Sequence, residues 1–403
     1  MMSSSIKNID GIIDNFVKWL ENFGELSQDH QDYLSGWYGG YAKDKYYRNP
    51  RIGHLLVAPM IFCEAFLPNT RALFKAKSRL PIADAHYAMA YSYLFQGHGN
   101  EQHYDRAVHF LEVLKDTRCP DFKNYCWGYP FDWVTVYGTF PQGTPMITAT
   151  PYCYDAFSDV YAIDKKDEWL SIMRSIATHT VEDLSEIEID DETAIASYTP
   201  VDNRQVINSN SYRAQLLARA SVELENPAYW EIGKRNLNYV LQNQSDDGSW
   251  IYATDGMGNF IDNFHTCFVM KHLYRIYHYT GDERCWNAIV NGNAYYRKVL
   301  LDEEGLPIPF AKPPRLIVYK RELYDYAECI NLGLLLRGKL PEWNNIIERL
   351  LGDLTARWLK ADGSFRSRKL RFGWDNCPMH RWAQSQLFRA LTIYSLSDKL
   401  DIK

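Results

Sequence analysis

The order of apolar and polar positions predicts a chain built almost entirely from helices. Residues 11–23 carry apolar side chains at helical spacing, and Asp10 stands where an N-terminal cap is expected. Residues 52–66 and 81–95 are apolar on nearly every side, which predicts two buried helices. The Gly- and Tyr-rich stretch at residues 37–50 predicts a turn region.

From residue 103 onward, two kinds of helix alternate. Amphipathic helices with charged faces are expected at residues 103–115, 166–184, 228–243, 284–300 and 342–358. More apolar helices are expected at residues 150–163, 208–223, 264–280, 324–337 and 380–396. The turns Asp247-Gly248, Glu304-Gly305 and Asp362-Gly363 recur roughly 60 residues apart, and each predicts a helix end followed by a short extended piece.

This repeat predicts an all-α closed double ring, with amphipathic helices outside and apolar helices inside. Together with the earlier apolar helices, it gives six or seven helical hairpins, that is, an (α/α)6-7 ring with short extended pieces in its loops. Residues 1–403 are expected to form one domain, because no linker composition interrupts them. An open solenoid is the alternative, but it does not require inner helices this apolar.

An aromatic segment at residues 124–155 is the most unusual part of the chain. It is interrupted by Gly and Pro and is rich in Tyr and Trp, so we expect an ordered loop. Ordered loops on a rigid scaffold often form binding surfaces. The alternative is an aromatic plug that packs the loop onto its own domain.

Composition excludes several classes of protein. Hydrophobic residues make up 46% and charged residues 23%, and the net charge of −6 gives no argument for nucleic-acid binding. No signal sequence is visible and no apolar window is long enough for a membrane span. The eight scattered Cys are then expected as free thiols in a cytoplasmic protein.

The repeat period, the motifs DGSW (247–250) and DGSF (362–365), and DNFHT (262–266) at the start of an apolar helix resemble the (α/α) toroid, six-hairpin glycosidase-like superfamily. More narrowly, residues 50–396 resemble uncharacterised members associated with bacterial exopolysaccharide and capsule biosynthesis. The resemblance implies a carbohydrate-active protein. It leaves the reaction open, because such toroids include hydrolases, lyases and epimerases.

In a ring of this kind, the outer-to-inner loops and the first turns of the inner helices share one face. Glycoside hydrolysis there would need two carboxyl groups, one as the acid and one as the base or nucleophile. The candidates are Asp132, Asp155, Asp262, Asp325, Glu328 and Asp375. We expect Asp132 and Asp262 to be the first to test, although an Asp at a helix start can also serve only as an N-cap.

Lyase or epimerase chemistry would instead need a base, an acid and a cation beside the reacting carbon. The candidates are Tyr152, Tyr212, Arg213, His265, His380 and Arg381. Each of them also has a purely structural alternative: a hydrogen-bonded core His, a packed Tyr or a salt-bridged Arg.

The substrate is expected to be an oligo- or polysaccharide, possibly containing uronates, because inner-helix N-termini favour anions. The residues expected to bind it are Trp127, Tyr129, Trp133, Tyr152, Asn210, Arg213, Trp250, Tyr326, Trp374, Arg381 and Trp382. No cofactor or metal is expected, and no phosphate-binding loop or serine-hydrolase motif is present. A zinc site combining Cys377 and His380 with Cys126, Cys329, His265 or Cys267 is a weaker alternative.

The sequence therefore predicts an enzyme that cleaves or remodels a bacterial polysaccharide or its precursor. Hydrolysis stands slightly ahead of elimination or epimerisation. The alternative from another class is a non-catalytic glycan-binding component of a polysaccharide biosynthesis complex.

Overall fold

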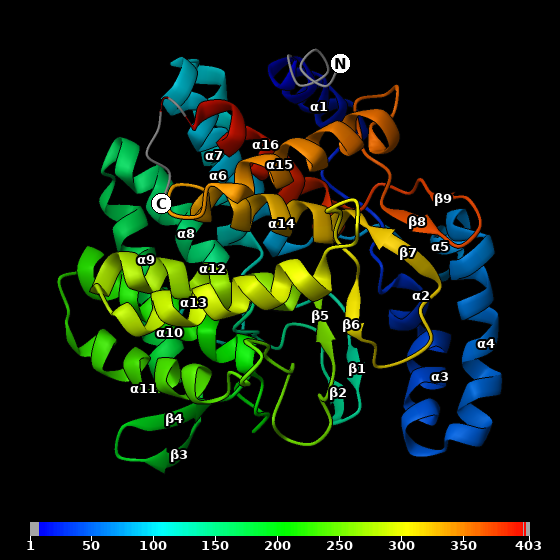
Figure 1. Cartoon of the computed structure of the whole chain (residues 1–403), viewed down its shortest axis with the longest axis horizontal. Coiled ribbons are helices and arrows are strands. Elements are labelled where there is room, and N and C mark those ends of the chain that lie inside the picture. The colour runs from blue at the N-terminus through cyan, green and yellow to red at the C-terminus, as the bar shows by residue number, and fades with distance from the viewer. Residues whose placement is uncertain (1–7, 398, 400–403) are drawn as a thin grey trace.

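A computed structural model describes residues 8–397 and 399, and it confirms the closed double ring (Figure 1). The inner ring consists of α6 (Pro81–His98), α8 (Thr150–Asp164), α10 (Ile207–Glu223), α12 (Asn263–Thr280), α14 (Leu323–Leu336) and α16 (Ser385–Leu396). Each of these helices contacts the next, and α16 returns to contact α6, so the ring closes.

The outer ring alternates with the inner one along the chain. It consists of α1 (Ile9–Phe23), α7 (Glu101–Asp116), α9 (Asp167–Glu182), α11 (Ala228–Gln242), α13 (Glu283–Tyr295) and α15 (Glu342–Asp353). The π-helical turns η2 (Tyr296–Leu300) and η3 (Leu354–Trp358) extend the last two, and η4 (His380–Gln384) precedes α16. The expected six or seven hairpins are therefore six.

The hydrophobic pattern explains which helix goes where. In α15, the buried residues Trp343, Ile346, Ile347 and Leu350 follow one stripe, so only that face can pack inward. In contrast, α14 is buried around its whole circumference, including polar positions. A helix that is buried along one stripe takes the outer place, and a helix that is buried on all sides takes the inner one.

The two ends of the ring differ in the length of their connections. Inner helices lead to outer ones through short turns at residues 99–100, 165–166, 224–227, 281–282 and 337–341. Outer helices lead back through long loops that contain β1 (Trp133–Thr135), β2 (Gly138–Phe140), β3 (Glu186–Asp190), β4 (Thr193–Ala196), β5 (Ile261–Asp262), β6 (Phe310–Lys312), β7 (Tyr319–Glu322), β8 (Arg368–Leu370) and β9 (Trp374–Asp375). All strand pairs are antiparallel, and two join successive loops: β5 pairs with β6, and β7 with β8. The long-loop end therefore carries a continuous layer of non-helical structure over the starts of the inner helices.

Two sequence predictions near the N-terminus are wrong. Residues 37–50 form no turn region, because α3 (Trp37–Arg48) occupies them and pairs with α4 (Pro50–Phe66) in a hairpin beside the ring (Figure 1). The expected buried helix at 52–66 is this α4, whose outer face is exposed: Leu55 by 77% and Phe62 by 55%. Apolar side chains predict a preference for burial, but they do not supply the second surface that burial needs.

Smaller elements connect this hairpin to the ring. They are α2 (Asp32–Ser35), η1 (Pro68–Thr70) and α5 (Arg71–Phe74). Within the described residues, no single helix has the length and apolar content to cross a membrane; α4 meets that test only jointly with its continuation to Phe74, across a bend of 118°.

The recurring Asp-Gly and Glu-Gly motifs form turns, but the preceding helices end before the glycines, at Gln242, Leu300 and Trp358. Gly248, Gly305 and Gly363 have φ angles of 89°, 75° and 92°, which only glycine adopts without strain. Each turn reverses the chain after an outer helix, and in two of them an isolated bridge pairs the flanking residues.

These turns provide a matched test of the fold. A Cβ at Gly248 would lie 2.3 Å from the Asn291 carbonyl oxygen, whereas at Gly305 it would lie 3.0 Å from the exposed Arg349 side chain, which can move. Left-handed strain costs about 1–3 kcal/mol in either case. We expect Gly305→Ala to lower the free energy of unfolding by roughly that amount and Gly248→Ala by at least about 1 kcal/mol more. Urea denaturation measures both, and equal losses would contradict the backbone clash.

Candidate functional site

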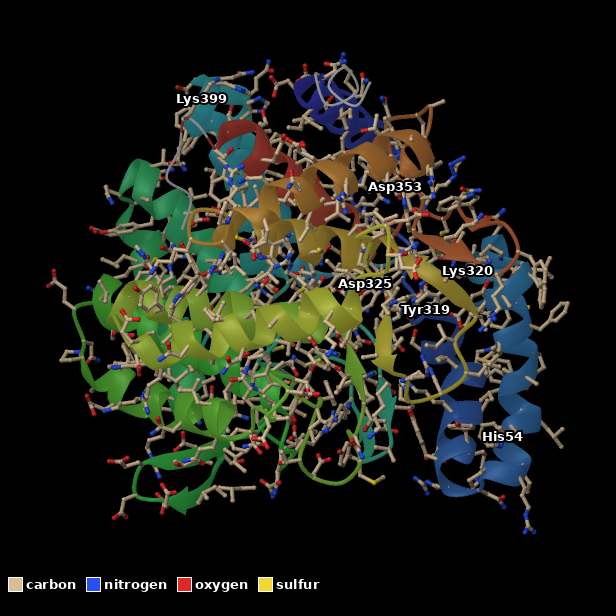
Figure 2. The ribbon with its side chains drawn as sticks, in the orientation of Figure 1. His54, Tyr319, Lys320, Asp325, Asp353 and Lys399 are labelled. Atoms are coloured by element: carbon tan, nitrogen blue, oxygen red, sulfur yellow. The ribbon has the colours of Figure 1, made fainter. Side chains whose placement is uncertain are left out.

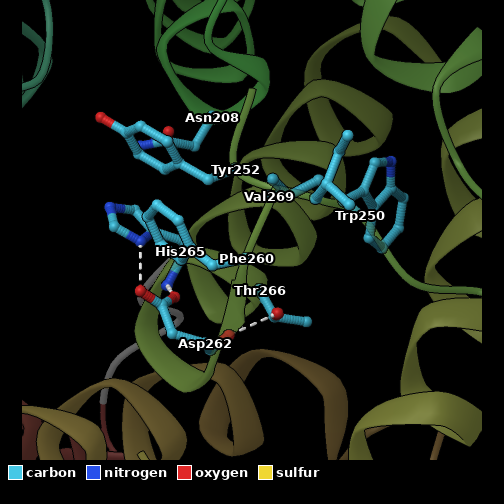
Figure 3. A pocket seen from close by; sticks show the side chains of 9 residues that line it. Asn208, Trp250, Tyr252, Phe260, Asp262, His265, Thr266 and Val269 are labelled. Carbon is cyan, nitrogen blue, oxygen red and sulfur yellow. Dashed lines mark hydrogen bonds and ion pairs between the residues drawn. The ribbon is translucent and has the colours of Figure 1, made fainter. Parts of the chain in front are cut away.

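A pocket opens at the long-loop end, between the starts of α10 and α12 and the loop that precedes α12 (Figure 3). Its lining residues are Asn208, Trp250, Ile251, Tyr252, Phe260, Asp262, His265, Thr266 and Val269.

Asp262 and His265 form a hydrogen-bonded dyad in the pocket wall. Asp262 ends β5 and caps α12, where one carboxylate oxygen accepts the His265 backbone N–H at 3.0 Å. The other oxygen lies 2.6 Å from His265 Nδ1 (Figure 3). Because a carboxylate only accepts, Nδ1 carries the proton, and the lone pair of the neutral ring is on Nε2. Among the described residues, none hydrogen-bonds to Nε2.

Aromatic and polar groups surround this dyad. The Tyr252 ring lies 4.7 Å from the His265 ring and stacks on Phe260 at the same separation. Asn208 Oδ1 is buried, and no group in the described part of the chain donates a hydrogen bond to it. A buried carbonyl oxygen usually accepts a hydrogen bond, so a substrate hydroxyl could supply the missing donor.

An aromatic platform continues from the pocket toward the last inner helix. Phe264 contacts both the His265 ring, at 4.4 Å, and the Trp382 ring, at 5.4 Å. Trp382 stacks on Tyr324 at 4.1 Å and on His30 at 3.9 Å. Flat apolar rings with polar edges suit the faces of sugar rings.

His30 is held by its neighbours and does not offer a free base. Burial lowers its pKa to about 3 despite the adjacent Asp29. Its Nδ1 lies 3.1 Å from Asp29 and 3.2 Å from Arg381, and its Nε2 lies 2.8 Å from the Gln31 amide nitrogen. Burial alone would raise the pKa of Asp29. The Arg381 guanidinium, 2.7 Å away, and the adjacent His30 have the larger effect and hold this pKa well below its usual range. Arg381 also donates to the Tyr129 hydroxyl at 3.2 Å, so this set anchors the aromatic segment to the ring.

Most candidate carboxylates form ion pairs or lie on the surface. Asp155 pairs with Arg219 and Arg275, Glu328 with Lys271, and Asp375 with Arg71. The exposed Asp132 accepts the Gln142 backbone N–H at 2.8 Å.

Asp325, in the first turn of α14, is the exception (Figure 2). Both its oxygens are buried without a partner in the described structure. Burial, together with the nearby carboxylates of Glu322 and Asp262, raises the pKa of Asp325 well above its ordinary value.

Several expected site residues connect elements away from the pocket. His380 is buried between α1 and α6, where it lies 2.6 Å from the Tyr87 hydroxyl and 3.0 Å from the Gly24 carbonyl. Burial lowers its pKa to about 4. Arg213 pairs with Glu186, as its salt-bridge alternative anticipated.

The remaining expected binding residues divide between core and loop contacts. The Asn210 side chain hydrogen-bonds to the backbone of Ala196 and Val206, and the Tyr326 hydroxyl donates to Asp353. The indole N–H of Trp127 donates to the Leu114 carbonyl, and that of Trp250 donates to the Val240 carbonyl. Trp250 still lines the pocket with its ring. Trp374 packs on Trp358, and Trp133 packs on Tyr129 within the aromatic segment. Tyr152 and Tyr212 hydrogen-bond to each other at 2.9 Å inside the ring.

Sequence reasoning missed Tyr252, Phe260 and His30. Tyr252 follows Trp250 by two positions after the Asp-Gly turn, so alternation along this extended piece offered a signal for it. No pattern marks His30, which reaches Trp382 only through the fold.

No group of three or more His, Cys, Asp or Glu within the described residues is placed to hold a metal ion, so the alternative zinc set is not brought together. The eight Cys are free thiols.

No protein-family model matches the sequence, and no curated protein matches it. Solved structures share its fold at low sequence identity. A cellobiose 2-epimerase from Bacillus thermoamylovorans B4167 matches with a TM-score of 0.65 and 9% identity, over 96% of this chain and 100% of the other. A D-mannose isomerase matches with a TM-score of 0.65 and 12% identity, over 98% and 99%. An unsaturated glucuronyl hydrolase specific for heparin matches with a TM-score of 0.63 and 12% identity, over 99% of each chain. The fold is thus that of an (α/α)6 toroid.

The unpartnered Asp325 gives a prediction about pH. A carboxyl group with a raised pKa in the folded state stabilises that state fully below its unfolded pKa of about 4, and the stabilisation is lost as pH rises through the folded pKa. The Asp325→Asn variant stays neutral, so we expect it to lack this loss. The difference in the free energy of unfolding, variant minus wild type, should therefore be on the order of 1–3 kcal/mol more positive at pH 8 than at pH 4. Denaturation curves at both pH values measure it. The exposed Asp132→Asn is the control, and parallel profiles for all three proteins would contradict the assignment.

Proposed function

We propose that the protein is a carbohydrate-active enzyme that moves a proton between adjacent carbons of a sugar, as in aldose–ketose isomerisation. The observation that carries this proposal is the Asp262–His265 dyad, which leaves one basic nitrogen, His265 Nε2, in a pocket lined by aromatic rings. The fold shared with an epimerase and an isomerase supports it as an analogy.

In this reaction, His265 Nε2 removes the proton from the carbon beside the carbonyl group of an open-chain sugar. Asp262 holds the ring in the required tautomer and stabilises the imidazolium that forms. The hydroxyl proton passes from the oxygen next to the reacting carbon to the former carbonyl oxygen, and the same His265 nitrogen returns the carbon-bound proton to the former carbonyl carbon on the same face. A single base is sufficient for this transfer, whereas inversion at one carbon needs a donor on each face.

Two pocket side chains are suited to the sugar hydroxyls. Burial raises the pKa of Tyr252, so its phenol stays protonated and can donate a hydrogen bond. Asn208 Oδ1 accepts one. Between them, these groups would fix the orientation of the carbon that faces His265.

Glycoside hydrolysis is the second candidate, and Asp325 is the observation that favours it. A buried carboxyl group with a raised pKa is suited to protonate a leaving oxygen. Asp262, which lies within its electrostatic reach, would be the base. For hydrolysis the proposed substrate is a bacterial polysaccharide, and for isomerisation it is an open-chain sugar that serves as a precursor of one. A non-catalytic glycan-binding protein would bind its glycan without turnover.

The decisive test is solvent exchange. The protein is incubated in D2O with aldoses, ketoses and oligosaccharides, and NMR follows carbon-bound deuterium while a reducing-end assay follows cleavage. We expect deuterium to enter at the carbons next to the carbonyl group. His265→Gln should reduce the rate by about 10²–10⁴-fold, the usual contribution of a general base. Asp262→Asn should reduce it by about 10–100-fold through loss of orientation. The exposed His98→Gln is the control.

Other outcomes separate the candidates. Full exchange by His265→Gln would refute the proton-transfer assignment. New reducing ends without deuterium, abolished by Asp325→Asn, would establish hydrolysis in its place. Binding without either signal would leave the glycan-binding role.

A further inference from the structure

Arg204 is a buried cation that makes no ion pair with any residue the structure describes. Its exposed fraction is 7%, and its Nε atom has no hydrogen-bond partner in that same part of the chain. The other buried arginines at this end, Arg71, Arg368 and Arg381, each pair with a carboxylate. Burying an uncompensated charge is costly, so a group of this kind calls for a ligand.

The groups around Arg204 do not neutralise it. Its guanidinium carbon lies 4.1 Å from the ring centre of Tyr137, 5.5 Å from that of Tyr198 and 5.6 Å from that of Tyr252. Burial raises the pKa of Tyr137 to about 12 and the pKa of Tyr198 and Tyr252 above its usual range, so all three phenols are neutral. Aromatic faces stabilise a cation but leave its charge in place.

The nearest carboxylates have other partners. Asp202 accepts the backbone N–H groups of Tyr198, Thr199 and Arg204, and the Thr199 hydroxyl. Asp255 accepts the hydroxyl of Tyr137. Both carboxylates therefore hold the tyrosine rings around Arg204 in place without pairing with its guanidinium.

Tyr252 places this cation beside the catalytic pocket. One face of the pocket is the Tyr252 ring, 4.7 Å from the His265 ring, and the same ring is part of the Arg204 cage. Arg204 is not itself among the residues that line the pocket, so a ligand that contacts His265 would have to extend past the Tyr252 ring to reach it.

Lys43 on α3 adds little positive charge to this region. It is 8% exposed, and burial lowers its pKa to about 7, so a large share of it is uncharged near neutral pH. Tyr47, one turn along α3, lies in the electric field of both Arg315 and Arg204. Arg204 is therefore the cation on which binding of an anionic substrate would depend.

We propose that Arg204 is the anion subsite of this pocket and binds the carboxylate or phosphate group of an acidic sugar whose reacting carbon lies at His265. The guanidinium presents planar donors that match either anion in a bidentate contact. The position of the reacting carbon rests on the proposed function, whereas anion binding at Arg204 does not. The substrate class is therefore an open-chain uronate or a sugar phosphate, not a neutral sugar.

Calorimetric titration tests the subsite without any activity. The probes are glucose, glucuronate, glucose 6-phosphate and inorganic phosphate, at constant ionic strength. We expect the wild type to bind at least one anionic sugar about 10- to 100-fold more tightly than glucose, as a charged hydrogen bond provides. Arg204→Gln should remove that preference and leave glucose binding unchanged. Arg174→Gln, which removes an exposed and unpaired charge on α9, should bind as the wild type does.

Each result has a defined meaning. Preference for glucuronate identifies a carboxylate subsite, and preference for glucose 6-phosphate or phosphate identifies a phosphate subsite. Equal affinity for all sugars, or an anion preference that survives in Arg204→Gln, overturns the proposal. If Arg204→Gln does not fold, Arg204→Lys keeps the charge but loses the planar donors, and an unchanged anion preference there also overturns it.

The exchange assay separates this subsite from the proposed function. Deuterium entry into neutral sugars that is unaffected by Arg204→Gln would refute the subsite and leave proton transfer standing. Anion preference lost in Arg204→Gln, with no deuterium entering any sugar, would establish the subsite and refute proton transfer.

Discussion

Buried ion pairs on the axis of the inner ring fix how its helices are placed around the site. Asp155 on α8 is bound by Arg219 on α10 and Arg275 on α12, and Lys271 on α12 pairs with Glu328 on α14. Losing one partner of a buried pair leaves an uncompensated charge, which costs about 3–5 kcal/mol. These pairs therefore hold four adjacent helices in one rotational setting. The helix α12, whose first turn carries His265, contributes a cation to both sets of pairs.

The same ion pairs decide what chemistry is left at the long-loop end. The sequence offers six candidate acids for a hydrolase, but three of them, Asp155, Glu328 and Asp375, balance Arg or Lys side chains. A carboxylate held between guanidinium groups is a poor proton acceptor, because the paired charge stabilises its ionised form. His265 differs in that its partner Asp262 occupies only one ring nitrogen. This free nitrogen, more than the shared fold, supports proton transfer as the proposed reaction.

Much of the fold follows from the sequence, because each hairpin repeats the same local signals. Apolar periodicity located both rings, and the recurring glycines located the turns. The Asp262–His265 dyad could also be predicted from the sequence, since the motif DNFHT places the two residues three positions apart at a helix start. The exposure of α4 could not be predicted from the sequence, because the burial of a helix depends on a partner surface that local composition does not specify. The position of His380 away from the pocket has a related cause: a polar residue at an inner-helix start can face an outer helix instead of the pocket.

The Tyr252 ring determines how one ligand could contact both the dyad and Arg204. This ring lies 4.7 Å from the His265 ring, and its centre lies 5.6 Å from the Arg204 guanidinium carbon. An acidic sugar whose anionic group is bound at Arg204 would therefore have to run along Tyr252 to bring a carbon to His265 Nε2. In the proposed reaction, Arg204 would position the substrate, and the Asp262–His265 dyad would transfer the proton.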